Sequence, residues 1–176
     1  MDLHNLVLHV KDSDVFVIFQ SKDVFSRPWC LLELHTAIEA GIPIVALNCA
    51  GKGYNFSAAS DFLLHLDTSL ATANPSALAL LEEHGVDPKL LAYSLHAVIP
   101  NLISVNFNAS ASANAIHAAL ADLVKVMQTA KPAVAPAATG FEEWLAAREN
   151  AKSVELRAVV AGSATIRGTQ RGRGCC

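Results

Sequence analysis

Short apolar runs alternate along the chain with stretches in which apolar residues recur at helical spacing. Residues 14–20 and 43–48 form apolar runs rich in β-branched side chains, a pattern typical of strands covered on both faces in a parallel sheet. Residues 102–107, which follow Pro100, predict a third strand. Residues 27–40 carry apolar side chains three and four positions apart and predict a helix. This alternation favours a layered α/β architecture over a helical bundle or a β-sandwich.

The other predicted helices rest on apolar stripes and on start signals. Asn-Pro and Asp-Pro pairs are such signals, since Asn and Asp cap helices and proline is tolerated in the first turn. We expect the end of a helix at 3–11, one helix over 58–73, one from Asn74-Pro75 to Gly85, a short one after Asp87-Pro88, and one capped by Ser110 or Ser112 with the stripe Ile116, Leu120, Leu123, Val124 and Met127.

The chain divides by composition into three parts. Residues 1–128 hold all the predicted strands and form one domain. Residues 129–140 alternate alanine and proline and read as a linker. Residues 141–176 are expected to hold one short amphipathic helix, 141–152, followed by a tail whose Gly, Arg and Thr content over 162–174 predicts disorder.

Composition limits the classes of function. The chain has 176 residues, of which 52% are hydrophobic and 16% charged, so a substantial core is expected. A net charge of −3 provides no cluster of cations for phosphates, so no nucleic acid partner is expected. The chain shows neither a secretory signal nor eighteen consecutive apolar residues, which predicts a cytoplasmic protein without a membrane span.

The most informative segment is the helix that follows the first apolar run. Ser26 is placed to cap this helix, with Pro28 in its first turn. Trp29 and Glu33 are four residues apart, so their side chains share one helical face. Burial beside the indole would raise the pKa of Glu33, whereas the helix N-terminus would lower it, and the sequence leaves this balance open.

These residues carry a resemblance to a known family. The segment Ser21 to Leu34, centred on Ser26-Arg27-Pro28-Trp29-Cys30-Leu31-Leu32-Glu33-Leu34, resembles the third strand and following helix of TIR (Toll/interleukin-1 receptor) domains. The likeness continues through Gly41-Ile42-Pro43-Ile44-Val45-Ala46-Leu47 and, more loosely, from Pro100 to Met127. It covers only the C-terminal part of such a domain. It implies a flavodoxin-like three-layer fold with a parallel sheet whose first strands are missing here.

The resemblance also implies a function. TIR domains transmit intracellular signals by associating with other TIR domains, which implies a homo-oligomer here. Many of them also cleave the nicotinamide–ribose bond of NAD+ with the glutamate that matches Glu33. Such a carboxylate would stabilise positive charge that develops on the ribose. In this reading Glu33 is catalytic, Trp29 and Ser26 support the substrate pocket, NAD+ is a substrate, and neither a cofactor nor a metal is required.

Alternatives to catalysis remain open. Residues 1–13 do not supply a neighbouring strand for the apolar run at Val15, and an exposed apolar strand edge invites association. We therefore expect an incomplete gene product or half of a domain that a partner completes, inactive towards NAD+ by itself. The rival reading is a non-catalytic adaptor in which Glu33 serves only helix packing, and a third is an inactive truncated fragment.

Other reactive residues have simpler interpretations. The stripe that Cys30 shares with Leu34 and Ile38 indicates a packing residue rather than a nucleophile. Gly51-Lys52-Gly53 reads as a turn, since it lacks the spacing of a phosphate-binding loop. None of the seven histidines has ligand spacing, so no metal is expected. The terminal pair Cys175-Cys176, beside arginines, could accept a lipid but does not form a prenylation motif, and its role stays open.

Overall fold

The computed structural model describes residues 3–168, with side chains described from residue 5 to residue 154. Three parallel strands form its sheet: β1 (Phe16–Gln20), β2 (Ile44–Cys49) and β3 (Ser104–Phe107) lie side by side in that order. Ile18 lies opposite Ala46, and Ala46 lies opposite Ser104. The central strand is the most deeply buried, as its continuous apolar run predicts.

Helices connect and follow the strands. α1 (Leu3–Lys11) precedes β1, and the 3₁₀ turn η1 (Val24–Ser26) and α2 (Pro28–Glu39) lie between β1 and β2. Between β2 and β3 the chain forms α3 (Phe56–Leu64), α4 (Leu66–Ala73), α5 (Pro75–Glu83), α6 (Pro88–Val98) and η2 (Ile99–Asn101), and α7 (Ala113–Thr129) follows β3.

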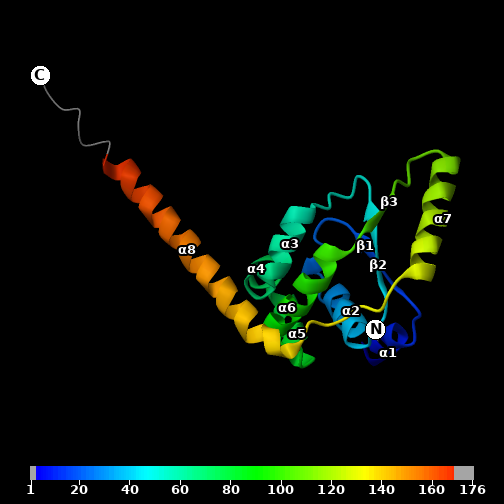
Figure 1. Ribbon diagram of the computed structural model, residues 1–176, viewed down its shortest axis with the longest axis horizontal. Helices are drawn as coiled ribbons and strands as arrows, with labels where there is room; N and C mark the ends of the chain where they lie inside the picture. Colours follow the sequence, from blue (N-terminus) through cyan, green and yellow to red (C-terminus); the bar gives the residue numbers. More distant parts are fainter. Residues whose placement is uncertain (1–2, 169–176) are drawn as a thin grey trace, which may run out of the picture. The chain divides into compact units, whose positions relative to one another are not determined.

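The sheet lies between two helical layers. Figure 1 shows α7 on one side of the strands and the group α2 to α6 on the other. The second layer holds most of the core, since its helices contribute the fully buried residues Leu31, Leu34, Leu63, Leu66, Leu70, Leu81, Leu91 and Leu95. This arrangement confirms the predicted α/β, flavodoxin-like fold with a parallel sheet.

The single helix predicted over residues 58–73 is wrong, because the chain breaks at His65 into α3 and α4. His65 has φ −112° and ψ 31°, outside helical geometry. The two halves have different neighbours: α3 packs against η2 and α6, whereas α4 packs against α5 and α6. Tertiary packing therefore sets a break that neither glycine nor proline marks in the sequence.

The chain forms two compact units, residues 1–136 and 137–176. The second contains η3 (Ala138–Gly140) and α8 (Phe141–Gly168). α8 continues past the predicted end at residue 152 as far as Gly168. The disorder predicted over residues 162–174 stays a prediction, and residues 169–174 lie outside the described residues. In α8 the Trp144 ring stacks on Phe141, with centroids 6.2 Å apart, and the guanidinium carbon of Arg148 lies 5.0 Å from the Trp144 ring.

No helix within residues 3–168 is long and apolar enough to cross a membrane.

Candidate functional site at the strand ends

The connection from β1 to α2 positions the predicted site residues. β1 ends at Gln20, and η1 then turns the chain into α2, which has Pro28 at its first position. The residue before Pro28, Arg27, is extended and occupies the N-cap position without a side-chain hydrogen bond. This backbone fits proline, whose ring favours an extended residue before it.

The prediction that Ser26 caps α2 is therefore wrong. Ser26 belongs to η1, where its hydroxyl donates a hydrogen bond to the backbone oxygen of Asp23 at 2.8 Å. Asp23 has a left-handed backbone, with φ 59°. The hydroxyl thus stabilises the tight turn that precedes the helix and makes no capping hydrogen bond to the first N–H groups of α2.

Trp29 and Glu33 lie one helical turn apart on α2, as their spacing predicts. Trp29 is 37% exposed, and its ring lies 6.4 Å from the His84 ring, centroid to centroid, at the end of α5. The Glu33 side chain is partly buried. The indole therefore packs beside the C-terminal end of α5, while more than a third of its surface stays exposed.

Burial decides the balance that the sequence left open at Glu33. The pKa of its carboxyl is raised, and the cause is desolvation by the surrounding protein. Glu33 is the sixth residue of α2, beyond the first turn within which the N-terminal dipole acts strongly. The side chain is therefore a carboxylate whose charged form is disfavoured by its surroundings.

Cys30 shares this part of α2. Burial raises the pKa of its thiol, the negative charge of Glu33 raises it further, and Arg27 opposes both. A raised pKa keeps the sulfur protonated, and a protonated thiol is a poor nucleophile. The structure thus supports a packing role for Cys30.

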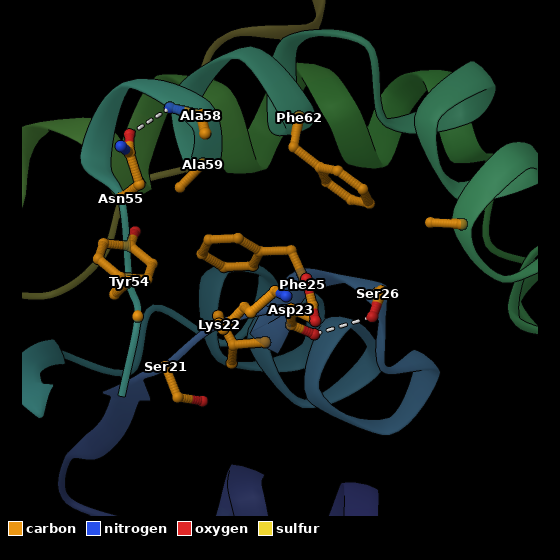
Figure 2. Close-up of a pocket in the computed structure, with 13 residues that line it drawn as sticks. Ser21, Lys22, Asp23, Phe25, Ser26, Tyr54, Asn55, Ala58, Ala59 and Phe62 are labelled. Atoms are coloured by element: carbon orange, nitrogen blue, oxygen red, sulfur yellow. Dashed lines mark hydrogen bonds between the residues drawn. The ribbon is translucent and has the colours of Figure 1, made fainter. Parts of the chain in front are cut away.

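A cavity of about 530 Å³ opens where β1 and β2 end. We call it the strand-end cavity (Figure 2). The loops after β1 and β2 form its floor, and α3 forms its roof. Open parallel sheets bind ligands at this edge, beyond the carboxyl ends of the strands. It is lined by residues 21–26, residues 53–55, Ala58, Ala59, Phe62 and Ala73.

Two long-range hydrogen bonds hold this cavity together. The backbone N–H of Lys22 donates to the backbone oxygen of Lys52 at 2.8 Å and joins the two strand-end loops. The side-chain Nδ2 of Asn74 donates to the backbone oxygen of Ser26 at 2.9 Å and joins η1 to the start of α5. The segments that line the cavity are therefore fixed to one another.

A buried polar contact lies beside the cavity. Gln20, the last residue of β1, is 1% exposed and its side chain hydrogen-bonds to Tyr54, which lines the cavity. Burial raises the pKa of the Tyr54 phenol, and the hydrogen bond from Gln20 opposes that rise. The Tyr54 ring packs edge to face on Phe56 at 5.0 Å between centroids, which fixes its orientation.

The structure separates the predicted site residues. Ser26 lines the strand-end cavity, but neither Trp29 nor Glu33 is among the described residues that line it. Sequence reasoning missed Gln20, Tyr54 and Phe62. The sequence held a signal for Gln20 and Tyr54, because α/β sheets place ligand contacts at strand ends. Gln20 is a polar residue that ends an apolar strand, and Tyr54 is an aromatic residue soon after the next strand.

No family model, curated protein or solved structure matches the chain. Among the described residues no group of three or more His, Cys, Asp or Glu side chains is arranged to hold a metal ion.

Proposed function

We propose that the chain is a TIR-type signal-transduction module that acts by associating with other TIR domains, in the first instance with further copies of itself. Glu33 occupies the position of the family's NAD+-cleaving glutamate. The resemblance over Ser21 to Leu34 motivates the proposal, and the parallel strand followed by a helix with Trp29 and Glu33 on one face is the local structure that the resemblance requires.

The observation that carries the association function is the outer edge of β1. Within residues 3–168, β1 pairs with β2 on one edge and with no strand on the other. Phe19, the fourth of the five residues of this apolar strand, is 60% exposed. An apolar edge strand offers both unpaired backbone groups and apolar area to another chain, so association through β1 is the function that the geometry supports best.

Sedimentation of the protein over a range of concentrations tests this proposal. We expect concentration-dependent association of the unaltered chain and its loss in Phe19→Lys, because a lysine on an edge strand opposes pairing. Phe56→Lys is the matched control, since Phe56 is 54% exposed but lies on α3. A chain that stays monomeric at all concentrations, or equal association of the two variants, would overturn the association function.

NAD+ cleavage by Glu33 is the second candidate function. The raised pKa and partial burial of Glu33 favour it, since a desolvated carboxylate interacts strongly with a nearby developing positive charge. The position of Glu33 outside the strand-end cavity argues against catalysis. We expect the isolated chain to release no more nicotinamide from NAD+ than Glu33→Gln does. Release that Glu33→Gln abolishes and Glu82→Gln retains would make catalysis the primary function.

A further inference from the structure

The walls of the strand-end cavity suit a flat apolar group. Phe62, Ala58 and Ala59 point down from α3, and Phe25 faces them from the loop after β1 (Figure 2). Aromatic rings and alanine methyl groups present flat, weakly polar surfaces, which pack well against a planar ring. The volume of about 530 Å³ lies within the range of small-molecule sites, roughly 300–1,000 Å³.

The polar groups of the cavity can orient such a ring. Asn55 caps α3 with its side-chain oxygen, which accepts the N–H of Ala58 at 2.9 Å, so its amide NH₂ is the part of the side chain that can donate to a ligand. Ser26 donates its hydroxyl hydrogen to Asp23, so its oxygen is the part that can accept. Donors and acceptors spaced around apolar walls match the hydrogen-bonding edge of a heteroaromatic ring.

The charges of the cavity disfavour an anionic ligand. Its lining contains Lys22 and, next to it, Asp23, one charge of each sign. The Ala58 N–H at the start of α3, which a phosphate would otherwise bind, is already used by Asn55. A polyphosphate would therefore meet one cation beside one anion and would lose its hydration without compensation.

We propose that the strand-end cavity binds a neutral, planar heteroaromatic molecule of about nucleoside size. Its ring lies between Phe62 and Phe25, and its polar edge faces Asn55. This site is independent of the proposed association function, because it contains neither β1 residues nor Glu33 in its described lining.

Isothermal titration of the full chain with adenosine tests the proposal, with ATP as the charged counterpart. We expect saturable adenosine binding, at least tenfold tighter than ATP. Ala59→Leu fills the cavity with a good helix former and is expected to weaken adenosine binding at least tenfold. Ala79→Leu, the same change at an exposed position of α5, is the control and is expected to bind as the unaltered chain does.

A second measurement does not depend on the folding of a variant. Amide chemical shifts of the unaltered chain are followed during the adenosine titration, and we expect saturating shifts at Lys22, Tyr54 and Ala59. Absence of shifts at millimolar adenosine, shifts centred elsewhere, tighter binding of ATP, or full-affinity binding by a folded Ala59→Leu chain would each overturn the proposal.

Discussion

The side-chain Nδ2 of Asn74 lies 2.9 Å from the backbone oxygen of Ser26, a residue 48 positions earlier in the chain. The same asparagine caps α5, because its Oδ1 accepts the N–H of Ala77 at 3.3 Å. One side chain therefore caps the start of α5 and also holds the turn that leads into α2.

Substitutions at Asn74 are expected to separate these two roles. Asn74→Asp keeps the capping oxygen and loses the donor to Ser26, whereas Asn74→Ala loses both. We expect Asn74→Asp to lower the free energy of unfolding by about 1 kcal/mol and Asn74→Ala by about 2 kcal/mol, measured by urea titration. No loss in Asn74→Asp would show that the bond to Ser26 contributes nothing, and equal losses in the two variants would show that the cap contributes nothing.

The left-handed backbone of Asp23 gives a second prediction. Asn and Gly tolerate the φ of 59° at this position. Alanine is strained there, because its Cβ carries no polar group that could compensate by a local hydrogen bond. We expect Asp23→Asn to leave the free energy of unfolding within about 0.5 kcal/mol, and Asp23→Ala to lower it by about 1 kcal/mol relative to Asp23→Asn. If Asp23→Ala is as stable as Asp23→Asn in chemical unfolding, the turn does not have this conformation.

The raised pKa of Glu33 predicts a change of stability with pH. Between the ordinary carboxyl pKa and the raised folded value, the folded state holds a proton that the unfolded state has released. Stability from this group is thus greatest at acid pH and is lost as the pH rises through that window. The side chain is partly exposed, so solvent screening keeps the effect small.

We therefore expect Glu33→Gln to be more stable than the unaltered chain at about pH 7, by no more than about 0.5 kcal/mol, and to lose this advantage at about pH 4. Thermal unfolding at the two pH values measures the difference. Glu82→Gln, an exposed glutamate of α5, serves as the control. The same advantage for Glu33→Gln at both pH values would contradict desolvation of the carboxyl.

His35, on the same helix, predicts a change of stability with pH in the opposite direction. Burial lowers the pKa of its ring, and the charge of Glu39 opposes this only in part. The folded state favours the neutral ring, so stability is lost as the pH falls from the ordinary histidine value through the lower folded value. The ring atom Nδ1 is also buried without a hydrogen-bond partner in the described part of the chain.

Replacement of His35 by glutamine is expected to reduce the loss of unfolding free energy between about pH 7 and pH 5. Urea titrations at both values measure it, with His117→Gln on the exposed surface of α7 as the control. A loss on acidification as large as that of the unaltered chain would exclude His35 as the titrating group.

The strands and α2 could be predicted because their signals are local. The continuous apolar run Val15 to Phe19 and the spacing of Trp29 and Glu33 each report a periodicity that the backbone imposes within a few residues. The same logic failed at His65, because α3 and α4 pack against different sets of later elements, and a local pattern does not report that packing.

The strand-end cavity could not be predicted in the same way. Phe25, Tyr54 and Phe62 come from three different segments, and only the fold brings them together. Sequence reasoning placed the site around Glu33 because a carboxylate on an apolar helix is visible in the sequence. An apolar hollow has no such mark, since its residues look like core residues until the space between them is known.

Each of the two compact units contains one of the chain's two tryptophans: Trp29 lies on α2 and Trp144 on α8. Removing one indole at a time would leave a fluorophore confined to a single unit. Emission from the two single-tryptophan proteins would then report whether both units melt in one cooperative transition or in two, which decides whether any unfolding curve of this chain describes a single equilibrium.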